Sequence, residues 1–202
     1  MRHALAFGAA GLAALSLAAC NKPASTTTSD AAQSAQSAVD KAQDTTGAAV
    51  GQASANTLGS HDTGAFVSNL TQSGMYEVQA AKIAEAKSKN PEVKAFAKMM
   101  VTDHTAMSNQ MKHIFAATNT KIPTELGARG KRMISDLNAA APADFDKLYL
   151  SQQQTTQAAE LTLLSGYAEG GESTDIKPAA AKAIPKIQAH LAKVHELQAA
   201  SK

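Results

Sequence analysis

The sequence predicts an all-helical protein whose folded part is a four-helix bundle, with a short extra helix in the crossover between helices 2 and 3. Three observations support this fold class. The apolar residues are mostly Ala, Leu and Met, which favour helices, and only 4% of the chain is aromatic. Apolar residues recur at helical spacing in four long segments, without strand-like alternation. One connection between these segments is longer than the others.

Residues 1–19 have the features of an export signal. An apolar run from Ala4 to Leu17 leads into small residues, and it is too short to serve as a permanent membrane-spanning helix. Leu17-Ala18-Ala19-Cys20 resembles the lipobox of bacterial lipoproteins, in which the signal is removed before the cysteine and that cysteine is lipidated. We therefore expect acyl chains such as palmitate on Cys20, with more than one chain for a stable anchor.

Residues 20–61 are expected to form the lipidated cysteine and a flexible tether. This stretch is rich in Ala, Ser, Thr and Gln, so it cannot bury enough apolar surface to offset the entropy of ordering it. Asn21 follows the cysteine, where Asp retains bacterial lipoproteins in the inner membrane. By that resemblance we expect an outer-membrane protein that faces the periplasm, with a folded domain over residues 62–200.

The composition excludes several functional classes. The net charge is +2 and no basic block stands out, so nucleic acid is not an expected partner. The single cysteine excludes an internal disulfide framework. A phosphate-binding glycine loop and a nucleophile motif are both absent from the sequence, and catalysis is therefore not indicated. The membrane is the expected partner, and the sequence identifies no protein or envelope-polymer partner.

The first two long helices are expected over residues 62–89 and 91–117. Asp62 or Thr63 can cap the first helix, and Asn90-Pro91 separates it from the second. The expected buried face of the first helix consists of Phe66, Leu70, Gly74, Ala81 and Ala84, with Glu77 among them, and that of the second consists of Val93, Phe96, Ala97, Met100, His104, Met107, Met111, Ile114 and Phe115.

A short helix is expected within residues 125–137, and two further long helices follow it. The third starts near Pro142 and stops at Gly170-Gly171, and the fourth runs from about Ser173 to Ala199. Pro185 should kink or split the fourth helix. The expected buried faces are Phe145, Leu148, Tyr149, Gln152, Thr156, Ala159 and Leu163 on the third helix, and Ile176, Ala180, Ala183, Ile187, Leu191 and Val194 on the fourth, with His190 on its flank.

Several short motifs lie along the predicted domain: Phe66, Met75-Tyr76-Glu77-Val78, the Met-Val-x-Asp-His segment ending at His104, Phe145-Asp146-Lys147-Leu148-Tyr149, and Ile184 to Leu191. With these motifs the chain resembles the ferritin-like family of unknown function found in predicted periplasmic and outer-membrane proteins of bacteria. The resemblance implies a ferritin-like bundle and no established activity. That family usually carries a histidine where this chain has Gln157, and the acid three residues later is present as Glu160.

The polar groups expected inside the bundle are Glu77, Asp103, His104, Gln157, Glu160 and His190. A metal site is one interpretation of them. A ferritin-like di-iron centre needs Glu-x-x-His on two helices, but Val101 and Ile187 stand three residues before the two histidines. A mononuclear Fe, Mn or Zn site built from Glu77, His104 and His190 stays open.

Two other interpretations of the same region are open. Met100, Met107 and Met111 share the face of His104, and this set of ligands suits copper(I), although methionine at this spacing commonly fills a core. In the structural interpretation, which needs no cofactor, His104 pairs with Glu77, and His190 pairs with Glu160 or Gln157. The expected function is a lipid-anchored envelope protein that exposes a binding or structural module. The alternative is a metal-binding stress protein or a metal-dependent oxidoreductase.

Overall fold

The computed structural model describes residues 61–201, which form helices and no strand. The expected export signal, Cys20 and nearly all of the expected tether lie outside the described residues. Within the described part, no helix is both long enough and apolar enough to cross a membrane. The five helices are α2 (Thr63–Lys87), α3 (Pro91–Phe115), α4 (Ala128–Ala139), α5 (Phe145–Gly170) and α6 (Ile176–Ala200).

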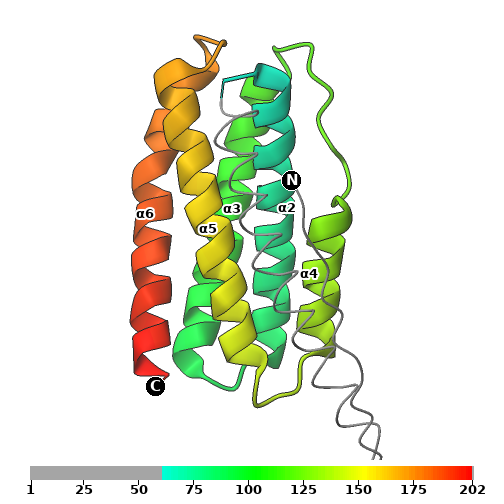
Figure 1. Cartoon of the computed structure of the whole chain (residues 1–202), viewed down its shortest axis with the longest axis vertical. Coiled ribbons are helices and arrows are strands. Elements are labelled where there is room, and N and C mark those ends of the chain that lie inside the picture. The colour runs from blue at the N-terminus through cyan, green and yellow to red at the C-terminus, as the bar shows by residue number, and fades with distance from the viewer. Residues whose placement is uncertain (1–60, 202) are drawn as a thin grey trace, which may run out of the picture. The chain divides into compact units, whose positions relative to one another are not determined.

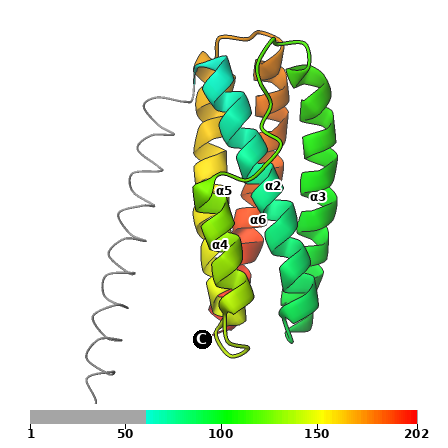
Figure 2. The same ribbon diagram turned by 90° about the vertical axis from the view of Figure 1, so that its right-hand side faces the viewer.

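The four long helices α2, α3, α5 and α6 lie side by side, and the shorter α4 packs outside them (Figures 1 and 2). Helix α2 contacts α3 and α5, while α6 contacts α5 and α3, so each long helix has two long neighbours. The connection from α3 passes across α2 to reach α4 (Figure 2). The side chain of Gln72 holds this connection, because it accepts a 2.6 Å hydrogen bond from Gly127 N and donates a 2.9 Å bond to Glu125 O.

Local signals explain where the helices begin and end. The Asp62 side chain caps α2 by accepting a hydrogen bond from Ala65 N, and Asn90 caps α3 just before Pro91. Helix α5 ends at Gly170, and Gly171 has extended backbone with a φ of −62°. A Cβ atom at Gly171 would collide with the ring of Tyr167. Close approach, rather than left-handed backbone, therefore explains this glycine.

Pro185 was expected to kink or split the last helix, and it does not split it, because α6 is continuous through this residue. The proline ring lies on the exposed side of the helix, away from the buried core. Residue 181, whose carbonyl loses its helical partner, is exposed as well and can be hydrated. Ala183 and Ile187 are buried on either side of the proline, so packing holds both halves of the helix in line.

A layer of buried polar side chains divides the core into two apolar clusters. One cluster contains Phe96, Tyr149 and Leu197, and the other contains Phe66, Phe115 and Tyr167. Every long helix contributes to both clusters and to the polar layer between them. The polar residues are thus flanked by apolar ones on each helix, for example Leu70 and Ala80 around Glu77, Met100 and Met107 around His104, Leu150 and Leu163 around Gln157, and Ile187 and Val194 around His190.

The expected buried faces of α2 and α3 were confirmed except at Ile114, which is only partly buried. The expected face of α5 was wrong at four positions that are only partly buried, whereas Gln153 and Gln157 are buried; the four are Leu148, Gln152, Thr156 and Ala159. Gln152 lies at the edge of the core, because its amide binds the Tyr76 hydroxyl at 2.8 Å. On α6, the expected face was wrong at Leu191, which is only partly buried, and His190 belongs to the buried face rather than to its flank.

Candidate functional site

The polar layer consists of six side chains, each at most 2% exposed, from all four long helices: Glu77, His104, Gln153, Gln157, Glu160 and His190. Five of them were predicted from the sequence. The sixth, Gln153, was missed, although its position four residues before Gln157 places it on the same helical face. Asp103, the remaining predicted residue, lies at the edge of the layer with 22% of its side chain exposed.

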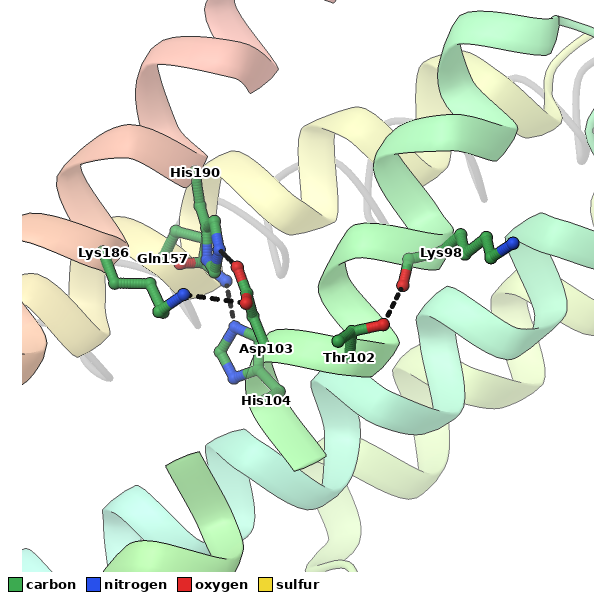
Figure 3. Close-up of polar contacts among 7 residues, drawn as sticks. All are labelled: Lys98, Thr102, Asp103, His104, Gln157, Lys186 and His190. Atoms are coloured by element: carbon green, nitrogen blue, oxygen red, sulfur yellow. Dashed lines mark hydrogen bonds and ion pairs between the residues drawn. The ribbon is translucent and has the colours of Figure 1, made fainter. Parts of the chain in front are cut away.

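Asp103 connects α3 to α6 (Figure 3). Its carboxylate accepts a 2.7 Å hydrogen bond from Lys186 Nζ and a 2.8 Å hydrogen bond from His190 Nε2. Burial alone would raise the pKa of Asp103, but these two donors outweigh burial and lower it. Because an ionised carboxylate only accepts, the neutral His190 ring carries its proton on Nε2. Its Nδ1 atom therefore presents a lone pair inside the protein, where it has no hydrogen-bond partner among the described residues.

His104 faces α5 and the ring of His190. Its Nε2 atom lies 3.0 Å from Gln157 Nε2 (Figure 3), and the two imidazole centroids are 5.3 Å apart. Burial lowers the pKa of His104 to about 3, His190 adds to this effect and Asp103 opposes it. His104 is therefore neutral at physiological pH, and its Nδ1 atom has no partner within residues 61–201.

The predicted pairing of these side chains was wrong. His104 contacts Gln157 instead of Glu77, and His190 contacts Asp103 instead of Glu160 or Gln157. The rotation of α3 explains both differences. It directs His104 towards α5 and directs the preceding residue, Asp103, towards α6.

Two buried carboxyl groups occupy the α2–α5 side of the layer. Burial raises the pKa of Glu77 well above its ordinary value, the nearby Glu160 adds to this, and the amides of Gln153 and Gln157 oppose it. These amides lie close to Glu77, yet neither of its oxygens has a hydrogen bond of ordinary geometry in the described part of the chain. Glu77 therefore keeps its proton to a higher pH than an exposed glutamate does.

Glu160 is the second buried carboxyl group, and it has one clear partner. Burial raises its pKa to about 7, although a hydrogen bond from Ser73 Oγ to Oε2, 2.6 Å long, acts in the opposite direction. Its other oxygen, Oε1, is buried and unpartnered among the described residues. The sequence analysis did not predict Ser73 as a site residue. Its position one helical turn before Glu77, on the same face, could have indicated it. Glu160 thus changes its charge near neutral pH.

Two surface grooves reach the polar layer. A groove of about 640 Å³ between α3 and α6 is lined by Asp103, Lys186 and His190, among other residues. A second groove, of about 390 Å³, is formed by α2, α4 and α5 and reaches Ser73 and Glu160. Small polar molecules could approach the layer from either side.

The polar layer can accept a guest, because many of its atoms lack partners. A buried polar atom without a hydrogen bond costs about 1–3 kcal/mol, so bound water, an ion or a small polar ligand would relieve this cost. As the side chains stand in residues 61–201, no three of the His, Cys, Asp and Glu groups lie close enough to hold a metal. The unpartnered atoms are Glu77 Oε1 and Oε2, His104 Nδ1, Gln153 Nε2 and Oε1, Gln157 Oε1, Glu160 Oε1 and His190 Nδ1.

Comparison with known proteins gives one match. A family model described as a domain of unknown function, DUF4142, matches residues 47–197, which is well over half of the chain. The match begins within the stretch expected to be a tether. No curated protein and no solved structure matches the sequence.

The raised pKa of Glu160 predicts that the contribution of this residue to stability falls as pH increases from about 4.5 to about 7. Below this range the carboxyl is protonated in both states. Within it, the unfolded chain ionises while the folded protein retains the proton, so folding loses roughly 3 kcal/mol, at about 1.4 kcal/mol per pKa unit. Urea unfolding between pH 4 and 8 measures this slope. Glu77, whose pKa is raised as well, gives a slope of the same sign, and the lowered pKa of His104 gives a slope of opposite sign below about pH 6.5. The contribution of Glu160 is therefore the difference between the slopes of the original protein and Glu160→Gln. Glu169→Gln, at an exposed position on α5, should show no such difference; equal slopes in both variants would contradict the assignment.

Proposed function

The chain belongs to the DUF4142 family, whose function is unknown, and on that premise we propose that it is a lipid-anchored envelope protein with a polar binding site inside its helical domain. In this proposal the lipid on Cys20 holds the protein in the outer membrane. The domain faces the periplasm, where it binds a small polar ligand. Catalysis is not part of the proposed function.

One observation carries the binding function: the four long helices meet at a polar layer that is only partly hydrogen-bonded. A layer that served only to fix the helix register would be expected to satisfy its own hydrogen bonds, because an incompletely paired network weakens a core. Here both oxygens of Glu77 and the Nδ1 atoms of His104 and His190 have no hydrogen bond of ordinary geometry in the described residues. These atoms favour a binding site over a purely structural network.

The order of the helices supports a ferritin-like four-helix bundle. Helices α2 and α3 form one antiparallel pair, and α5 and α6 form another (Figure 1). A single long connection containing α4 joins the two pairs, as in ferritin-like folds. Bundles of this kind build their ligand sites from side chains on facing helices, and the polar layer has such a position.

Metal binding is a second candidate function, and the contact between Asp103 and His190 favours it. Histidines that bind metals commonly donate their other ring N–H to a carboxylate, which fixes the ring. His190 Nε2 donates to Asp103 in this way, and Nδ1 keeps its lone pair. Small side-chain rotations would be needed to bring Glu77 or His104 into reach of the same ion.

The binding function predicts that Glu77→Met stabilises the protein. The variant removes an incompletely paired buried carboxyl and retains a side chain of similar length, so the free energy of unfolding should rise by about 1–3 kcal/mol. Gln152→Met is the matched control, because it leaves the Tyr76 hydroxyl without its partner and should destabilise the protein. Urea denaturation measures both variants. A destabilised Glu77→Met variant would support the structural interpretation instead.

The anchor predicts lipid on Cys20 in a bacterial host that processes lipoproteins. Intact mass and acyl labelling of membrane fractions should detect a modified mature protein that begins at this residue. Cys20→Ser should abolish both the label and the membrane association. An unmodified, soluble mature protein would refute the anchor.

The metal candidate predicts near-stoichiometric Fe, Mn, Zn or Cu in protein that is produced without its export signal. Elemental analysis measures the metal, and His104→Ala should lose it because an imidazole ligand is removed. His113→Ala is the control, since that histidine is exposed. Metal-free protein whose thermal stability does not change on addition of each ion would exclude this candidate.

A further inference from the structure

The groove formed by α2, α4 and α5 is lined by both an acidic residue, Glu160, and a basic residue, Arg129. Its inner wall includes Glu160, which is 98% buried and keeps one oxygen unpartnered among the described residues. Its outer wall includes the first turn of α4, with Ala128, Arg129 and Gly130. An ionised carboxylate at one end and hydrogen-bond donors at the other end are complementary to a ligand that carries both charges.

The carboxyl group of Glu160 in the groove is held by a hydrogen bond. Ser73 Oγ donates to Glu160 Oε2 and holds the carboxyl in place, so that Oε1 is left to accept a further hydrogen bond. Thr156 and Tyr76 also line the groove. An ammonium group would supply the missing donor and would compensate the charge of the ionised Glu160.

The opposite end of the groove combines a helix N-terminus with an arginine. The N-cap of α4 is Gly127, which provides no side-chain cap, so the N–H groups of the first turn keep their capacity to donate. The helix dipole and the exposed Arg129 guanidinium add positive potential there. Gln72 fixes this end over α2 by its two hydrogen bonds to residues 125 and 127.

We propose that this groove binds a small zwitterion, such as an amino acid or a dipeptide, with its ammonium group on Glu160 and its carboxylate on Arg129 and the first turn of α4. A volume of about 390 Å³ suits a molecule of this size. The two walls come from segments far apart in the sequence, and Gln72 and Ser73 of α2 bond to the α4 side and to Glu160 respectively. The inference rests on the proposed binding function and names the class of its ligand.

Three probes with one scaffold test the inference: dialanine, N-acetyl-dialanine, which lacks the ammonium charge, and dialanine amide, which lacks the carboxylate. Isothermal titration calorimetry at pH 7.5, on the full chain purified in detergent, measures their dissociation constants. Dialanine should bind about tenfold or more tightly than either blocked probe, because each blocked probe loses one charge-assisted contact.

Variants assign the two ends of the groove. Glu160→Gln should abolish the preference for dialanine over N-acetyl-dialanine, and Arg129→Ala should reduce the preference over dialanine amide. The matched controls Glu169→Gln and Arg132→Ala change exposed residues on the same helices outside the groove and should bind like the original protein. Circular dichroism verifies that each variant is folded.

Equal binding of N-acetyl-dialanine would show an anion site only, and equal binding of dialanine amide would show a cation site only. Either result overturns the inference, as does the absence of binding by all three probes. If no probe binds and Glu77→Met still stabilises the protein, the binding function stands with a ligand of another class. If no probe binds and Glu77→Met destabilises it, both proposals fail.

Discussion

The enclosure of two carboxyl groups and two imidazoles between apolar clusters is the constraint on which this structure depends. Each of the four long helices contributes one of these groups, namely Glu77, Glu160, His104 and His190. Rotation of any one of these helices would therefore expose a polar group or move it away from its neighbours. Burial disfavours the charged form of each group, because it raises the pKa of both carboxyl groups and lowers that of both imidazoles. Burial of apolar surface in the clusters on either side offsets the free-energy cost of burying this polar layer.

Asp103, at the edge of the layer, provides a hydrogen-bond partner for one of the two buried histidines. It stays ionised because Lys186 and His190 donate to it, and it fixes the proton of His190 on the outer nitrogen. The inner nitrogen is therefore an acceptor, like the oxygens of Gln157 and Glu160. These three unpartnered acceptors suit a guest that donates hydrogen bonds or carries positive charge. Both the zwitterion and the metal ion have this property, and they differ in where they would lie.

The sequence predicted the helices well because local residues determine their ends. Asp62, Asn90-Pro91 and Gly170-Gly171 each end or begin a helix within a few residues of the expected place. The face of α5 was harder to predict, because Gln152 and Gln153 are equally polar and hydropathy cannot rank them. The Tyr76 hydroxyl, from another helix, selects which amide stays at the edge. The partners of His104 and His190 likewise depend on helix rotation, which one sequence does not encode locally. The raised pKa of Glu160 requires the burial that only packing reveals.

Carbon-13 NMR of the glutamate carboxyl carbons tests the central claim directly, with Glu77→Gln and Glu160→Gln used to assign the two signals. If both carboxyl groups are buried between the apolar clusters, Glu160 should titrate with a pKa near 7, and the pKa of Glu77 should lie well above the ordinary range of a glutamate. Ordinary titration of both signals near pH 4.5 would contradict the account, because it would mean that the two carboxyl groups are solvated and that the polar layer is not enclosed.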